Sequence, residues 1–252
     1  MGSDPRLGCQ PAAAAEGLES DFQSMPQSIR TFRLAMPFHL GSVNCYLLEA
    51  NSGFVLVDTG ISYQRKELEG ELEGAGCRPG NLKLILVTHG DFDHTGNAAY
   101  LRGRFASRIA MHAGDLGMAE EANMFFNRSR SNALIKALAP RFSGFRKADR
   151  FTPDFTVQDG FDLSEYDLDA TVLGIPGHSK GSIGVLTASG DLFCGDLLVS
   201  SHKPALNSII DDLAAANASI QKLRSMQIGM VYPGHGEPFP LDRLQEGSAS
   251  AA

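Results

Sequence analysis

The sequence predicts an α/β domain in which layered sheets are covered by helices. Its 252 residues lie at the upper end of single-domain length and can bury a sizeable core. Strand-like and helix-like segments alternate along the chain, and the second half is richer in short strands. The clearest strand, residues 82–88 (LKLILVT), is almost wholly apolar, as is typical of a strand buried on both faces.

The first half predicts a sheet with helices between its later strands. Three strand-like runs come first, and the Thr59-Gly60 turn ends the third. A charged segment with spaced leucines, residues 64–74, predicts a surface helix before strand 82–88. A second helix is expected over residues 95–104, followed by a strand over 108–112. The three opening runs are residues 29–34, 43–49 and 53–58.

The second half predicts short β segments separated by glycine turns, then one long helix and a last strand over 229–232. The helix is expected over residues 208–226, because apolar residues recur there at helical spacing. Those residues are Ile209, Leu213, Ala216, Ile220 and Leu223. The β segments are residues 171–175, 182–187 and 191–194.

The composition of three segments predicts the domain boundaries. Residues 1–28 are rich in Ala, Gly, Ser, Asp and Pro without an apolar period, and we expect a disordered tail. Residues 29–245 then form a single domain. Within it, residues 113–150 are helical by propensity and predict a helical insertion that packs its apolar face on the body. Seven basic against four acidic residues there leave a lid over an anionic substrate as the alternative.

Charge and cysteine usage exclude several kinds of partner. The formal charge of -7 argues against a general nucleic-acid partner. No apolar run reaches the roughly 20 residues that span a bilayer, and the N-terminus lacks a basic segment followed by an apolar core. The four cysteines are scattered without a C-x-x-C pair, so we expect a reducing, cytoplasmic location. The expected partner is a small-molecule substrate.

The segment 86–97 (LVTHGDFDHTGN) carries the strongest chemical signal. His89, Asp91, Asp93 and His94 fall within six positions, directly after the buried strand. Imidazole nitrogen and carboxylate oxygen are ligands for zinc, iron or manganese. In an extended turn alternate residues point the same way, so His89 and Asp91 can hold one ion. Asp93 and His94 would then face a second ion.

Three further ligand types follow, each beside a strand end and flanked by glycine. They are His178, Asp196 and His235. The glycines leave room for the backbone to turn and present these side chains to a common point. A lone His or Asp in a turn is more often a cap or a turn former. Seven such residues at successive strand ends, where open α/β sheets bind ligands, instead predict a metal site.

These motifs resemble those of the metallo-β-lactamase superfamily, whose signature is H-x-H-x-D-H followed by separate His, Asp and His. The resemblance runs from about Ile29 to Phe239 and includes the Asp58-Thr-Gly60 turn. It implies an αββα four-layer sandwich with a dinuclear site between the sheets. By position, the first metal would be held by His89, Asp91 and His178, and the second by Asp93, His94 and His235. Asp196 would bridge them.

One position departs from that signature. Asp91 stands where the family has its second histidine, giving H-x-D-x-D-H. A carboxylate hardens the first site and favours iron or manganese more than imidazole would. The flavodiiron proteins of the superfamily also carry a carboxylate there. Two divalent metal ions are expected, with zinc first and iron or manganese as alternatives. The alternative consequence of the carboxylate at Asp91 is a weaker first site that loses its metal easily.

The resulting hypothesis is a dinuclear metallo-hydrolase that uses a metal-bridged hydroxide on a small ester, lactone or thioester-like substrate. Asp93 would orient the attacking water or accept its proton. Asp58 would orient a ligand histidine, although a simple turn Asp is an equal alternative. Lys203 or His202 could contact an anionic group of the substrate, with a solvated loop as the alternative.

Other functions remain open at this point. Asp91 allows a non-haem iron oxidoreductase of the same fold, and the resemblance also admits β-lactam and phosphodiester hydrolases. A non-catalytic binding protein ranks last, because all the ligand types are present.

Overall fold

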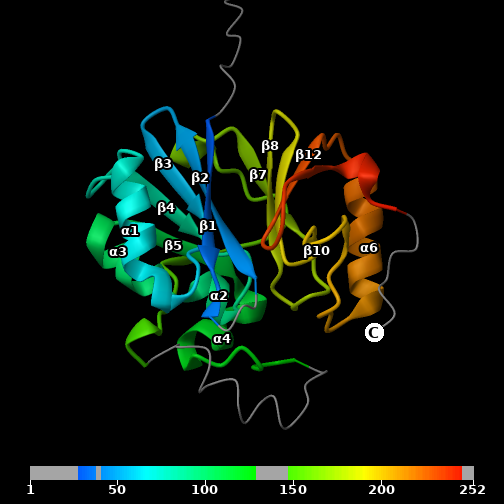
Figure 1. The fold of residues 1–252 in the computed structure, drawn as a ribbon, viewed down its shortest axis with the longest axis horizontal. Helices are drawn as coiled ribbons and strands as arrows, with labels where there is room; N and C mark the ends of the chain where they lie inside the picture. The colour runs from blue at the N-terminus through cyan, green and yellow to red at the C-terminus, as the bar shows by residue number, and fades with distance from the viewer. Residues whose placement is uncertain (1–27, 38–40, 129–146, 246–252) are drawn as a thin grey trace, which may run out of the picture.

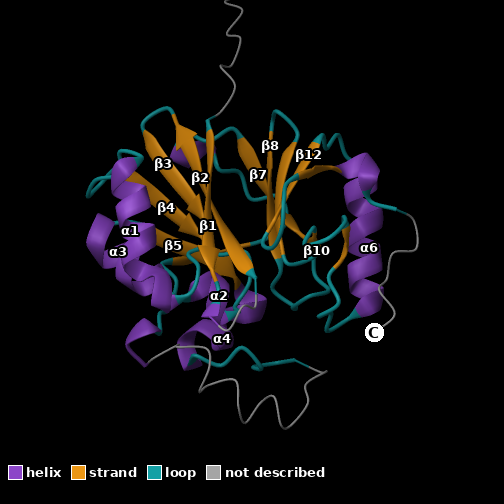
Figure 2. Cartoon of the chain, in the orientation of Figure 1, coloured by secondary structure: helices purple, strands orange, loops and turns teal. Residues whose placement is uncertain are grey.

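Two β-sheets face each other, and helices cover the outer side of each (Figures 1 and 2). This computed structural model describes residues 28–37, 41–128 and 147–245. The arrangement confirms the expected αββα sandwich. Residues 1–27 of the expected disordered tail and residues 129–146 of the expected helical insertion lie outside the described residues.

The first sheet joins an antiparallel part to a parallel part. The strands from β1 to β3 pair antiparallel, and those from β3 to β6 pair parallel. Helices α1 (Arg65–Gly74) and α3 (Ala98–Phe105) cover its outer face (Figure 1). In spatial order the strands are β1 (Ile29–Ala35), β2 (Ser42–Ala50), β3 (Gly53–Val57), β4 (Leu82–Leu86), β5 (Arg108–His112) and β6 (Phe155–Val157).

The second sheet comes from the second half of the chain. Helix α6 (Leu213–Arg224) covers its outer face, and β10 (Leu198–Val199) pairs separately with β11 (Ala205–Leu206). In spatial order its strands are β13 (Phe239–Pro240), β12 (Met230–Pro233), β9 (Asp191–Gly195), β8 (Ile183–Thr187) and β7 (Ala170–Gly174). Short 3₁₀ helices connect the larger elements at Ser62–Gln64, Ala113–Asp115, Lys147–Asp149, Ser164–Tyr166 and Leu241–Arg243.

Apolar side chains fill three layers between these elements. The central layer joins the two sheets, with residues such as Leu48, Val57 and Leu84 opposite Val172 and Phe193. One outer layer lies between the first sheet and α1 and α3, and the other lies between the second sheet and α6. Since apolar burial is the main favourable term in folding, these layers fix the two sheets relative to each other.

The helix expected over residues 208–226 is shorter at its start. It begins at Leu213, because the Asp212 side chain accepts a hydrogen bond from the Ala215 amide and caps it. Upstream, the amides of Asp211 and Asp212 both donate to the Gly177 carbonyl. The apolar Ile209 therefore lies outside the helix and is 63% exposed.

The segment over residues 113–150 is described only in part. It contains α4 (Leu116–Glu121) and the 3₁₀ turns on either side, and residues 129–146 lie outside the description. The insertion and its lid alternative therefore remain predictions. Among the described residues, no helix is both long enough and apolar enough to cross a bilayer.

Candidate metal centre

The seven predicted ligand side chains come together between the sheets, in the loops that follow β4, β7, β9 and β12. Six are buried, and the His235 side chain is 19% exposed. They adjoin a cavity of about 670 Å³, whose lining includes Asp91, Asp93, His178, Asp196 and His235.

The turn after β4 differs in one respect from the expected extended conformation. Asp91 is extended, but residues Phe92–Thr95 form the short helix α2. The amides of His94 and Thr95 and the Thr95 hydroxyl all donate to the Asp91 carbonyl. Four residues are too few for helical periodicity to be visible in the sequence. The helix places Asp93 close to His235 and His94 close to Asp196.

Each of the four histidines is held through Nδ1, which leaves Nε2 facing the carboxylates. His94 Nδ1 lies 2.8 Å from Asp58 Oδ2, and His89 Nδ1 lies 3.0 Å from the Thr88 hydroxyl. His178 Nδ1 lies 2.6 Å from the carbonyl of Ile209, and His235 Nδ1 lies 2.8 Å from that of Ser42. Such contacts fix the tautomer and orientation of metal-binding imidazoles.

Asp58 links two parts of this arrangement. It directly follows β3 and lies in the left-handed region, with φ of 62°. This conformation is uncommon outside glycine but more accessible to Asp than to most residues. Its carboxylate accepts hydrogen bonds from the amide and hydroxyl of Thr88, both at 2.8 Å, besides contacting His94. One carboxylate thus orients His94 directly and His89 through Thr88.

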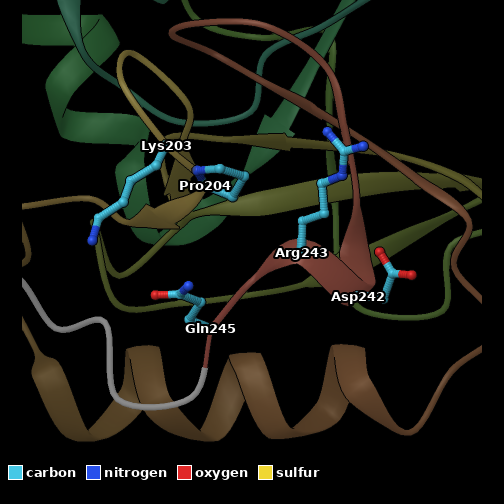
Figure 3. A pocket seen from close by; sticks show the side chains of 5 residues that line it. All are labelled: Lys203, Pro204, Asp242, Arg243 and Gln245. Carbon is cyan, nitrogen blue, oxygen red and sulfur yellow. The ribbon is translucent and has the colours of Figure 1, made fainter.

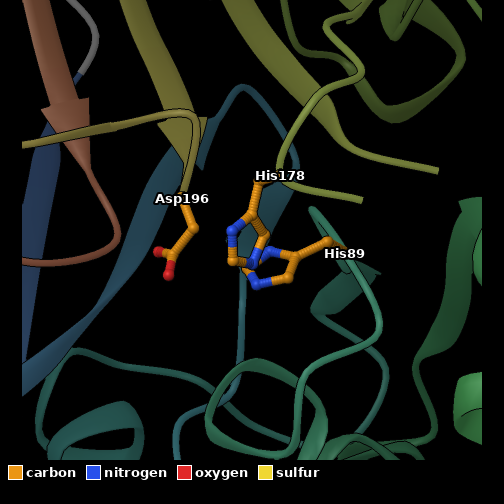
Figure 4. A group of neighbouring side chains, drawn as sticks. All are labelled: His89, His178 and Asp196. Carbon is orange, nitrogen blue, oxygen red and sulfur yellow. The ribbon is translucent and has the colours of Figure 1, made fainter. Parts of the chain in front are cut away.

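The ligand atoms form two groups. In the first, His89, His178 and Asp196 offer atoms within 4.8 Å of one another (Figure 4), and in the second Asp93, His94 and His235 do the same. Asp196 also approaches the second group, with Oδ1 3.3 Å from His94 Nε2 and Oδ2 3.3 Å from His235 Nε2. That position between the groups suits the bridging role that the resemblance implies, which stays a prediction.

Buried atoms without partners test whether a metal fits here. His89 Nε2, His94 Nε2 and Asp196 Oδ1 are buried and have no hydrogen-bond partner. Buried polar groups are nearly always satisfied, so three orphans in one place call for a ligand. Nitrogen and oxygen donors in this mixture suit a divalent ion of the zinc, iron or manganese type. The residues present fit such an ion.

A model of the metallo-beta-lactamase superfamily matches residues 40–235. The chain belongs to this superfamily. Among curated relatives, metallo-beta-lactamase domain-containing protein 1 of Homo sapiens is 27% identical over 79% of this chain and 64% of its own length. The acyl-coenzyme A thioesterase MBLAC2 of Bos taurus is 26% identical over 80% of this chain and 75% of its own. The chain spans less than two thirds of the first two curated relatives.

Solved structures of the superfamily share the fold. The crystal structure of TTHA1623 in a di-iron-bound form is 26% identical, with a TM-score of 0.65, and the match covers 84% of this chain and 95% of that one. The αββα architecture therefore agrees with the superfamily.

Mutual charge stabilises the ionised forms of two histidines of the second ligand group and of the nearby Asp196. Burial opposes the charging of His235, but Asp196 and Asp93 raise its pKa to about 11. Burial likewise opposes the charging of His94, and the carboxylates of Asp58, Asp196 and Asp93 raise its pKa well above the usual range. The Asp196 carboxyl has its pKa held well below its usual range, because His235 and His94 outweigh the effect of burial.

Asp91, the position that departs from the superfamily signature, has a cationic partner. Arg128 Nη2 lies 2.8 and 2.9 Å from the two Asp91 oxygens and 3.1 Å from His178 Nε2. Burial opposes ionisation of Asp91, but the Arg128 charge and the two histidines hold its pKa well below the usual range. In the sequence Arg128 is only one of the seven basic residues of the segment 113–150, whereas in the structure its side chain is 6% exposed.

Asp115 is a second residue that sequence reasoning missed. Its buried carboxylate accepts from the amide of Gly90 at 3.0 Å, the amide of Gly181 at 2.8 Å and the hydroxyl of Ser179 at 2.6 Å. It therefore ties the turn that carries His89 and Asp91 to the loop that carries His178. Neither Arg128 nor Asp115 has ligand spacing in the sequence, so only the tertiary fold reveals them.

His202 and Lys203, the predicted contacts for an anionic group, line the cavity together with Ser201 and Asn207. Lys203 also borders a smaller pocket of about 380 Å³, formed with Pro204, Asp242, Arg243 and Gln245 (Figure 3). The structure thus brings both residues to the cavity that adjoins the candidate metal centre. Their contact with substrate remains a prediction.

Proposed function

We propose that this protein is a metal-dependent hydrolase of small thioesters or related esters. The observation that carries the proposal is the convergence of four imidazole Nε2 atoms and three carboxylates beside a cavity of about 670 Å³. Such a donor set has no simple structural explanation, because it leaves three buried polar atoms without partners.

His89, His178 and Asp196 would hold one divalent ion, with Asp91 as the further predicted ligand, and Asp93, His94 and His235 would hold another. We propose zinc as the metal. Bound there, the ions would supply an activated water as nucleophile and electrostatic stabilisation of the charge that develops on the substrate oxygen. Asp58 and Thr88 orient two of the imidazoles for this purpose.

Asp93 would handle the proton of the attacking water. Its carboxylate lines the cavity, with Oδ2 3.4 Å from His235 Nε2. Burial opposes its ionisation, but the charges of His94 and His235 keep its pKa below the usual value. In the metal-free protein Asp93 is therefore an anion. With metal bound, its carboxylate would accept the proton of the attacking water and pass it to the leaving group.

The cavity supports a substrate with an apolar part and a polar part. Met36, Phe92 and Leu206 are among its apolar lining residues, and Lys203 supplies a cation. An acyl group would pack on the former, and a negatively charged portion would pair with the latter. The similarity to a relative named as an acyl-coenzyme A thioesterase supports a thioester over a lactone or a simple ester.

Turnover on a substrate panel tests this proposal. The metal-loaded protein should hydrolyse acyl thioesters faster than lactones, β-lactams or phosphodiesters. Asp93→Asn should lower kcat by about 10²–10⁴-fold, the usual contribution of a general base. Asp169→Asn, at an exposed aspartate, is the matched control and should keep full activity. Equal turnover of Asp93→Asn and the control would contradict the role of Asp93, and no hydrolysis of any panel member would contradict the function.

A non-haem iron oxidoreductase is the second candidate. The carboxylate at Asp91 and the di-iron-bound form of TTHA1623 favour it. Iron in the purified protein and an absorbance change on reduction would support it. A colourless zinc protein that hydrolyses thioesters would exclude it.

A further inference from the structure

The Arg128 guanidinium lies among the side chains predicted to hold the first metal. Its Nη2 donates to both oxygens of Asp91 and lies 3.1 Å from His178 Nε2. The His178 ring gives its Nδ1 hydrogen to the carbonyl of Ile209, so the neutral ring has its lone pair at Nε2, which lies 3.1 Å from Arg128 Nη2 and 3.0 Å from Asp91 Oδ2. One cationic nitrogen thus faces three lone-pair atoms, which is the environment that a metal ion requires.

The guanidinium and a divalent ion cannot both use these atoms. A bound ion would need the same lone pairs of Asp91 and His178, and two buried cations at contact distance repel strongly. Arg128 also leaves His89 Nε2 without a partner, whereas a metal would bind it. The second group differs, since within the described residues the ion-pair partners of Asp93 and Asp196 are histidines.

The backbone before Arg128 is held in place by contacts of its own. The Arg128 amide donates to the Phe125 carbonyl at 3.2 Å, and the Asn123 amide donates to the Met118 carbonyl of α4 at 3.0 Å. The Phe126 ring packs so closely on Gly117 that a Cβ there would collide with it. The backbone turn therefore stays in place, and release of Asp91 requires movement of the long Arg128 side chain alone.

We propose that Arg128 is an internal cation that competes with the first metal and so determines which position fills. The group of Asp93, His94 and His235 binds its ion first. A further ion occupies the first metal site, that of His89, Asp91 and His178, only when the guanidinium leaves Asp91 and His178. This inference rests on the metal-centre part of the proposed function and is independent of the substrate.

Titration of the metal-free protein with Zn²⁺, followed by calorimetry, tests the competition. The wild type should show one tight and one weak binding step. In Arg128→Gln the weak step should tighten by about tenfold or more, because the competing state no longer reduces the fraction that can bind, and the tight step should stay unchanged. Arg102→Gln is the matched control, since Arg102 contacts Asp154 and Thr152 far from the ligands. Arg128→Lys keeps the charge and should give an intermediate shift.

Thermal unfolding gives a second readout. Arg128→Gln should strengthen Zn²⁺ binding but weaken the stability of the metal-free protein. In that metal-free state Arg128→Gln should lower Tm by roughly 5–10 °C, because Asp91 loses its buried partner. With saturating Zn²⁺ the deficit should vanish. The double variant Asp91→Asn/Arg128→Gln should recover much of the metal-free stability, because no unpaired charge remains.

Two results would overturn the proposal. One is an unchanged weak step in both Arg128 variants, and the other is a loss of metal from Arg128→Gln, which would make Arg128 a support for the site. Both readouts are independent of turnover. Failure of hydrolysis with a confirmed Zn²⁺ competition would therefore contradict the proposed function alone.

Discussion

At the scale of single residues, the candidate site depends on side chains that orient the ligands. Asp58 illustrates this, because its left-handed backbone aims one carboxylate at both Thr88 and His94. Asp and Asn tolerate this conformation better than most residues do. The residue thus combines a backbone requirement with a hydrogen-bonding one.

Asp58→Asn should weaken metal binding by about 10–100-fold, as is usual when the partner of a ligand histidine is altered. Asn keeps the backbone conformation but replaces one carboxylate oxygen with a donor, which cannot accept from Thr88 or His94. Calorimetric titration with Zn²⁺ measures the change. Asp167→Asn is a matched control, since Asp167 also has a positive φ of 57° but lies on the surface. Equal metal affinity in both variants would exclude an orienting role for Asp58.

At the scale of elements, the ligand loops are tied to each other across the two sheets. Asp115, at the start of α4, joins the turn after β4 to the loop between β7 and β8. The loop carrying His235 is held in the same way, because the Asn44 amide group donates to the carbonyls of Pro233 and Gly236 from β2. The loops therefore have a fixed geometry before any ligand binds.

Asp115→Ala should lower the free energy of unfolding by about 3 kcal/mol, because three buried donors lose their acceptor. Urea denaturation at neutral pH measures this. Zn²⁺ affinity should fall more for the group containing His89 and His178 than for the group containing His235. Asp159→Ala is the control, since Asp159 also accepts from a backbone amide, that of Gly174, but is exposed. Its cost should stay below about 1 kcal/mol. A similar cost in both variants would argue against the tie.

Whole elements could be predicted to the extent that their signals are local. Strands such as Arg108–His112 matched the prediction because an apolar run between turns is visible in the sequence alone. The predicted start of α6, at residue 208, was wrong. The apolar spacing begins before Asp212, but Asp212 caps the helix and so fixes its start at Leu213. Arg128 could not have been found, because its contact with Asp91 spans 37 positions and depends on the path of the chain.

At the scale of the whole molecule, the metal centre lies across the interface of the sheets. His89, Asp91, Asp93 and His94 follow a strand of the first sheet, whereas His178, Asp196 and His235 follow strands of the second. A metal ion bound by both sets would therefore link the two halves of the sandwich in addition to their shared apolar core.

Metal removal should accordingly destabilise the entire fold. A ligand that binds only the native state adds about 2.7 kcal/mol when its free concentration is a hundred times its Kd. Treatment with a chelator should lower Tm, and Tm should rise again with the logarithm of added Zn²⁺. Protein that is already metal-free serves as the control for direct effects of the chelator. A Tm that is independent of Zn²⁺ would contradict a link between the sheets.

The anchors of His178 and His235 are main-chain oxygens, those of Ile209 and Ser42. A carbonyl persists whatever side chain its residue carries, and both residues line the cavity. Substitution at positions 42 and 209 can therefore reshape the substrate wall while the imidazoles keep their acceptors. The fold separates the part that must stay constant from the part that can diverge, which makes these two positions natural starting points for altering specificity.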